Sequence, residues 1–270
     1  DHAKFVAAVL NSRLAIWYAF HGTSSFGSSR PEVQQAELLR LPMPEPENLA
    51  SEKQAREARE ELVNTVDRHR EEQTKALKSP DFEEEILREI DKLTYAYFGL
   101  SDDEITLIED AVQYIFPAAQ PNVGSFPELW KTSRLQERTA YANQLTHSLS
   151  HWFDHNRQLS VDLVGSNQDF GILRLKLHSK QEDGEARYSE SSDTSFSDAL
   201  GALSIALSRP IAQNFQTVPD MKIFVGNSLY LIKPMQRRFW LRSTALADAD
   251  SVVSDLETMI ATNPDRGLTS

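Results

Sequence analysis

The sequence of 270 residues contains no cysteine. Disulfide bonds, thiolate metal sites and cysteine nucleophiles are therefore excluded, and the absence fits a reducing compartment. The apolar stretch from Phe5 to Phe20 is shorter than the roughly 20 residues that a membrane-spanning helix requires, and it contains Arg13. We therefore expect no membrane segment and a cytoplasmic protein.

Common catalytic signatures are also missing. The sequence has no phosphate-binding glycine loop, no Gly-x-Ser-x-Gly turn and no His-Glu-x-x-His pair.

The chain begins at Asp1 instead of a methionine, and Ala3 already belongs to an apolar helical pattern. We therefore expect a piece excised from a longer polypeptide.

Basic residues are scarce relative to acidic ones, because 28 Lys and Arg stand against 40 Asp and Glu and give a formal net charge of −12. This balance argues against a general nucleic-acid binder, which needs Lys and Arg for its phosphate contacts. The acidity is concentrated in residues 48–124, which contain nine basic and 18 acidic residues. The rest of the chain can therefore still face DNA.

Composition divides the chain into three predicted domains. Residues 1–47 contain the apolar helix, a Gly/Ser loop and the connector L-P-M-P-E-P at 41–46, whose alternating prolines cannot continue a helix and are expected to end a unit. Residues 48–124 are predicted to form a charged helical spacer. Residues 125–270 are predicted to form a module with a small antiparallel sheet and helices on one face. The predicted fold class is therefore α+β.

The segment from Ser51 to Lys78 is predicted to be a charged helix with a thin apolar seam. The seam consists of Ala55, Ala58, Leu62, Val66 and Leu77. A solvated helix that packs along one stripe explains this pattern, and so does a helix that pairs with a protein partner. Both interpretations stay open at this point.

Two further helices are predicted in the spacer. The first starts near Pro80 and ends at Gly99, which favours a left-handed cap. Ser101 and Glu104 then form a capping box that opens the next helix, and Pro117 is expected to end it. The inward face of that helix is predicted to contain Ile105, Ile108, Val112 and Ile115.

The last segment alternates between helical and strand patterns. Helices are predicted over 133–158, 198–208 and 245–262. Strands are predicted over 161–164, 172–178, 222–225, 229–233 and 237–243. The polar run over 179–195 is predicted to be a loop.

Three histidines, His147, His151 and His155, are four residues apart on a predicted helix, so their imidazoles share one face. Such a row can chelate zinc or nickel, although a catalytic site would also need a carboxylate or a third ligand in good geometry. The apolar side of the helix, with Leu145 and Leu149, lies nearly opposite. We interpret the row as a solvent or interface face and assign no metal ligand, with metal binding as the alternative.

The stretch K-P-M-Q-R-R-F-W-L-R-S from Lys233 to Ser243 is the best local candidate for nucleic-acid contact. As a strand it would place Arg238, Trp240 and Arg242 on one face. Guanidinium groups stack on aromatic rings and bind phosphate through two parallel hydrogen bonds. We therefore predict DNA contact by these side chains, and the alternative is a surface strand whose arginines cover Trp240.

A nuclease-like arrangement is a further hypothesis. Asp220 and Lys222 precede an apolar strand, as in part of a metal-dependent nuclease core. That chemistry needs additional carboxylates to hold magnesium, and Asp162 or Asp169 would have to supply one. Residues 125–265 would then form a divergent nuclease or hydrolase module.

A third hypothesis is a protein–protein scaffold built on the acidic helices.

Several short motifs occur in a recognisable order. They are V-L-N-S-R-L at 9–14, the loop G-T-S-S-F-G-S-S at 22–29, E-L-L at 37–39 and the proline connector. This order resembles the end of target-recognition domains in restriction–modification proteins, both the TaqI-like domain of adenine-specific DNA methyltransferases and the type I specificity subunits. Residues 85–112 are similar to the helical tail of large single-chain (type IIG) methyltransferases. The resemblance covers about residues 3–116.

The resemblance implies a non-catalytic C-terminal part of such a methyltransferase, which contributes DNA target recognition and partner docking. Its partners would be DNA and the remainder of the parent protein. The family's Asn-Pro-Pro-Tyr motif and glycine-rich cofactor site are absent, so no cofactor is expected in this chain, and S-adenosylmethionine is expected for the parent.

The resemblance also suggests roles for residues near the start of the chain. Ser24, Ser25 and Arg30 would lie in the loop nearest the DNA backbone, where hydroxyl groups and backbone amides reach phosphates. Asn11 and Ser12 would satisfy backbone groups where the helix meets the recognition sheet. An amphipathic helix with a polar side toward water is the alternative explanation for these two residues.

Overall fold

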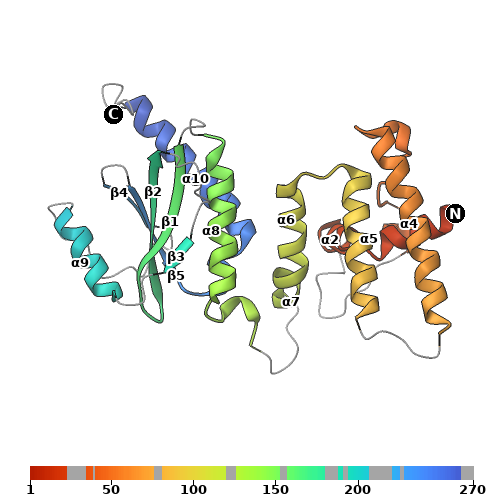
Figure 1. Cartoon of the computed structure of the whole chain (residues 1–270), viewed down its shortest axis with the longest axis horizontal. Coiled ribbons are helices and arrows are strands. Elements are labelled where there is room, and N and C mark those ends of the chain that lie inside the picture. The colour runs from red at the N-terminus through yellow and green to blue at the C-terminus, as the bar shows by residue number, and fades with distance from the viewer. Residues whose placement is uncertain are drawn as a thin grey trace. The chain divides into compact units, whose positions relative to one another are not determined.

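The computed structural model divides the chain into two compact units, Asp1–Ser125 and Phe126–Ser270, which are described separately (Figure 1). The described residues are 1–22, 35–38, 40–75, 81–119, 126–152, 157–179, 188–190, 194–206, 221–225 and 228–262. In these ranges the first unit is helical and the second contains a five-stranded sheet, which confirms the predicted α+β class. None of the described helices is long and apolar enough to cross a membrane.

The apolar stretch at the start of the chain forms two helices, α1 (His2–Leu10) and α2 (Arg13–Gly22), instead of the single helix predicted. The break is at Asn11 and Ser12. The buried Ser12 hydroxyl donates a hydrogen bond to a carbonyl in the last turn of α1 (2.6 Å) and accepts one from an N–H in the first turn of α2 (3.3 Å). The Asn11 amide donates to another α1 carbonyl (2.8 Å). Both side chains therefore satisfy backbone groups at a helix junction.

A carboxylate far along the chain completes this junction. Asp91, on α5 (Phe82–Phe98), accepts a hydrogen bond from the Arg13 backbone N–H (2.7 Å) and forms an ion pair with the Arg13 guanidinium (3.3 Å). Burial raises the pKa of Asp91, against the opposing effect of the Arg13 hydrogen bond and charge. The start of α2 is thus capped both by its own chain and by α5.

The apolar seam of α4 (Glu52–Gln73) faces the core of its own unit. Its members Ala55, Ala58 and Leu62 are buried against α1 and α5, and Val66 is partly buried against the same cluster. Leu77 lies outside the described residues. The seam is therefore covered within the unit, and the solvated outer side of α4 carries the charges.

The proline connector packs against the same core. The Tyr97 hydroxyl of α5 donates a hydrogen bond to the Pro44 carbonyl (2.6 Å), and Leu41 and Met43 contact the cluster. Pro46 is buried at the start of a short 3-10 helix, η1 (Pro46–Asn48). Because Leu41 and Met43 pack against the cluster and Pro46 is buried, the connector runs along the core of the first unit instead of leaving it. The boundary predicted at residues 47/48 therefore does not separate two compact units.

The capping predictions on either side of residue 100 are confirmed. Gly99 has a left-handed φ of 67°, and Ser101 with Glu104 forms the reciprocal capping box that opens α6 (Asp102–Asp110). Pro117 does not end the helix as predicted. A π-helical turn (Ala111–Ile115) precedes α7 (Phe116–Ala119), and this wider turn changes the helical register before the proline. The changed register leaves Ile115 40% exposed instead of inward.

The described elements can be followed in Figure 1. The described residues of the first unit also include a short helix, α3 (Gln35–Leu38). The second unit contains η3 (Glu128–Trp130), α8 (Leu135–Ser150), β1 (Arg157–Ser166), β2 (Phe170–Ser179), β3 (Tyr188–Glu190), α9 (Phe196–Ala206), β4 (Met221–Val225), β5 (Ser228–Pro234), η4 (Arg237–Phe239) and α10 (Arg242–Thr262). The strand order is β3-β1-β2-β5-β4, antiparallel except for the parallel pair β1 and β3.

Helices cover both faces of this sheet, which corrects the prediction of one covered face. α8 and α10 pack on the face that contains Leu173 and Leu175, and α9 packs on the face that contains Ile172 and Ile232 (Figure 1). The central strands β2 and β5 present apolar side chains on both faces. Each face therefore needs its own cover of helices.

Three predicted boundaries in the second unit are wrong. The helix predicted over 133–158 begins at Leu135 and ends at Ser150, and residues 157–166 form β1. The polar run contains β3 beside the edge of β1. The strand predicted over 237–243 is instead the 3-10 helix η4 followed by the start of α10. The last of these changes the candidate DNA-binding face.

Replacing two glycines of the second unit by alanine should change the free energy of unfolding in opposite directions. A Cβ on Gly165 would lie 2.6 Å from the Ala199 Cβ and 2.9 Å from the Ser195 carbonyl oxygen, whereas one on Gly201 of α9 would meet no heavy atom within 4 Å. We expect Gly165→Ala to lower the free energy of unfolding by about 1–3 kcal/mol through overpacking. Gly201→Ala should raise it by about 0.5–1 kcal/mol through helix propensity. Urea unfolding measures both, and a stable Gly165→Ala variant would contradict the contact of α9 with β1.

A charged group is buried in the core of the second unit. Lys233 on β5 is 1% exposed, and its ammonium contacts the Asp248 carboxylate of α10 and the Tyr141 hydroxyl of α8 (3.2 Å). The Tyr141 hydroxyl also donates a hydrogen bond to Asp248. These contacts join the sheet to both helices on one face.

Breaking this pair should be more destabilising than replacing it. We expect Asp248→Ala to lower the free energy of unfolding by about 3–5 kcal/mol, because the Lys233 ammonium loses its carboxylate. The double variant Lys233→Met with Asp248→Leu should recover most of that loss, since it removes the buried charge. Urea unfolding followed by circular dichroism distinguishes the two. Equal losses in both variants would contradict this expectation.

Candidate nucleic-acid interface

The two short 3-10 helices of the second unit lie side by side. The Arg237 N–H donates to the Lys131 carbonyl (2.8 Å), and the Ser133 N–H donates to the Met235 carbonyl (2.7 Å). These backbone bonds hold η3 against η4, although the two segments are about a hundred residues apart in sequence. Side chains from both segments therefore share one surface.

Arg238 is the exposed cation of this surface. Its guanidinium carbon lies 4.2 Å from the ring centroid of Trp130 and 4.6 Å from that of Phe239. We call Trp130, Arg238 and Phe239 the Arg238 platform. Trp130 is 45% exposed, and within the described part of the chain Arg238 forms no ion pair. The guanidinium is thus oriented by aromatic rings, and none of the described carboxylates neutralises it.

The prediction from the sequence placed Trp240 on this surface, whereas the exposed tryptophan is Trp130. Trp240 is 1% exposed, and its indole N–H donates to the Pro234 carbonyl (2.8 Å) while its ring packs edge-on against Tyr141 (5.4 Å between centroids). Arg242 is half-buried at the start of α10. The predicted common face of Arg238, Trp240 and Arg242 therefore does not exist, because the chain turns into a helix at this point.

Four charged side chains of these segments, Lys131, Glu128, Arg237 and Glu137, are paired with each other. Arg237 is buried and contacts both Glu128 and Glu137, the latter at 2.8 Å. Hydrogen bonds from Lys131 and then from Arg237 lower the pKa of Glu128 to about 2. Glu128 therefore stays ionised and neutralises charge beside the platform without touching Arg238.

Apolar side chains extend the same stretch of chain. Phe126 is 65% exposed and Leu135 is 56% exposed, on either side of Trp130 in sequence. Large exposed aromatics next to an unpaired arginine are typical of surfaces that bind nucleic acid or protein. Sequence reasoning missed Trp130 because its partner Arg238 is distant in the chain. The only available signal was the aromatic and basic composition of residues 126–134.

No protein-family model matches this chain, and no curated protein or solved structure matches it. Ser24, Ser25 and Arg30, the other predicted DNA contacts, lie outside the described residues.

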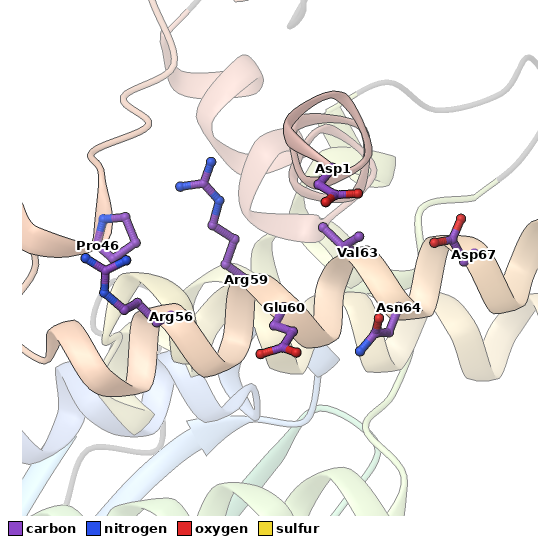
Figure 2. A pocket seen from close by; sticks show the side chains of 8 residues that line it. All are labelled: Asp1, Pro46, Arg56, Arg59, Glu60, Val63, Asn64 and Asp67. Atoms are coloured by element: carbon purple, nitrogen blue, oxygen red, sulfur yellow. The ribbon is translucent and has the colours of Figure 1, made fainter.

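The first unit contains a charged groove, which is shown in Figure 2 and is a second candidate site for an anion. Arg56 and Arg59 rise from α4 near Pro46, and Asp67 lies at the other end with Asp1. Arg56 is paired with Glu47, and Arg59 is paired with Glu45 (2.6 Å). Because carboxylates neutralise both guanidinium groups, this groove is a poorer anion site than the Arg238 platform.

Among the described residues, Lys222 and Asp162 of the nuclease hypothesis are not brought together. Asp220 lies outside the described residues, and the Lys222 ammonium pairs with Asp255 of α10 (2.6 Å). Asp162 pairs with Arg174 (2.8 Å) on β1 and β2, which β5 separates from the β4 strand of Lys222. In the described ranges, no group of three or more His, Asp or Glu residues is arranged to hold a metal ion.

Glu128 should make the stability of the second unit sensitive to acid. Its folded pKa of about 2 lies below the ordinary 4.5, so the unfolded chain binds more protons between these values. The contribution of Glu128 is present above that range and is lost as the pH falls through it. We expect Glu128→Gln to reduce the loss of urea resistance between about pH 5 and about pH 2.5. Asp250→Asn, at an exposed site on α10, is the control and should leave that loss unchanged.

Proposed function

We propose that this chain is a non-catalytic C-terminal part of an adenine-specific DNA methyltransferase of a restriction–modification system. It contributes DNA contact and docks to the remainder of the parent protein. The resemblance over about residues 3–116 supports the family, and the Arg238 platform supports contact with DNA. Methyl transfer and S-adenosylmethionine binding belong to the remainder of the parent under this proposal.

The observation that carries the DNA contact is the exposed guanidinium of Arg238 on two aromatic rings. Stacking restricts the side chain, so less rotamer entropy is lost when it binds a partner. The N–H groups of a guanidinium match two phosphate oxygens at once. Trp130, being half-exposed, adds a surface for sugar or base contacts.

The charge balance limits how strongly this chain binds DNA by itself. A net charge of −12 repels the DNA backbone, so the second unit relies on a small number of unpaired cations. Arg134 is exposed near Trp130 in sequence and forms no ion pair among the described residues. Arg238 and Arg134 therefore provide the local positive charge, and the parent protein provides the remaining affinity.

Fluorescence anisotropy with a labelled mixed-sequence duplex tests the proposal. For the whole chain at low salt we expect Arg238→Ala to raise the Kd by about five- to tenfold and to reduce the salt slope by about one. Trp130→Ala should raise the Kd and leave the salt slope unchanged, because it removes no charge. Lys176→Ala removes the same charge from an exposed position on β2 and serves as the matched control.

Two results would contradict the proposed DNA contact. One is the absence of any salt-dependent binding by the unmodified chain. The other is an equal loss of affinity in Arg238→Ala and Lys176→Ala, which would indicate general charge effects instead of a site. Magnesium-dependent cleavage of the duplex, abolished by Asp220→Ala, would support the nuclease hypothesis in its place.

A further inference from the structure

Two histidines of α8 lie together on its exposed side. His147 and His151 are four residues apart, both are exposed, and their ring centroids are 5.2 Å apart. The apolar side of the same helix packs on the sheet through Leu145 and Leu149. The two imidazoles therefore have no part in the core of the unit.

The ring separation matches that of two ligands on one metal ion. A tetrahedral zinc ion holds each imidazole nitrogen at about 2 Å, which places two such ring centroids roughly 5 Å apart. The imidazole nitrogens of exposed side chains can reach this geometry by rotation about χ angles alone. The positions of His147 and His151 on α8 thus allow the ring spacing that chelation requires.

The position on the helix also favours a cation. His147 is in the last turn of α8, and His151 is the residue that ends it. Unpaired carbonyl groups give this end of a helix a partial negative charge, which attracts positive ions. This field acts in addition to the two nitrogen ligands.

We propose that His147 and His151 form a two-histidine site for a divalent metal ion of the zinc and nickel class. Neutral imidazoles prefer these borderline ions over magnesium or calcium, which require oxygen ligands. Two protein ligands leave coordination positions open to water or to a ligand from another molecule. The site is separate from the Arg238 platform and does not depend on the proposed DNA contact.

Isothermal titration calorimetry of the full chain with zinc chloride tests this site. We expect one zinc ion per chain to bind through His147 and His151. His147→Asn and His151→Asn should each weaken binding at least about tenfold, since loss of one ligand removes chelation. His178→Asn, at an exposed position on β2, is the matched control and should bind zinc like the unmodified chain.

Circular dichroism of each variant checks that α8 stays folded, which is expected because both side chains are exposed. The proposal is overturned if the unmodified chain takes up no zinc. It is also overturned if both α8 variants bind zinc as tightly as the His178→Asn control.

Discussion

The burial of Trp240 is the constraint on which the candidate interface depends. Its indole fills the core between the sheet and α8, and its N–H group is satisfied by the Pro234 carbonyl at the end of β5. A buried tryptophan contributes roughly 4–6 kcal/mol of apolar burial as an upper value. Because residues three apart share a face of a 3-10 turn, Arg237 and Trp240 both lie inward and Arg238 between them faces outward. Arg238 is exposed because Trp240 is not.

The same constraint explains why sequence patterns failed at this segment. The alternation of residues 237–243 fits a strand with Arg238, Trp240 and Arg242 on one face, and it fits a turn into a helix equally well. Tertiary contacts decide between the two, since the backbone of η4 bonds to η3 more than a hundred residues earlier. Composition could indicate the Arg238 side chain as a candidate. It could not identify Trp130 as the ring beside it.

Local chemistry was far more predictable than long-range packing. The left-handed cap at Gly99 and the capping box at Ser101 depend on a few neighbouring residues, and the structure confirms both. The break at Asn11 and Ser12 is different in kind. The prediction that their side chains satisfy backbone groups is confirmed. The recognition sheet expected beside them is not found among the described residues of the first unit. The carboxylate that completes the junction belongs to Asp91, which is 78 positions after Arg13. No periodicity in the sequence points to that partner.

The distribution of charge is compatible with the DNA contact proposed for this acidic chain. Two acidic groups beside the Arg238 platform, Glu128 and Glu137, are held by Arg237, a cation of their own unit. The field near Arg238 is therefore set by local unpaired charges more than by the net charge of −12, because screening limits the reach of exposed charges to about 10 Å. A single oriented arginine gives a weak contact in isolation. Tethered to a domain that already binds the duplex, the same contact becomes intramolecular, and its effective concentration rises to roughly millimolar values. Under the proposed function, a contact of this size therefore suits an auxiliary part of a larger DNA-binding protein better than a binder that acts alone.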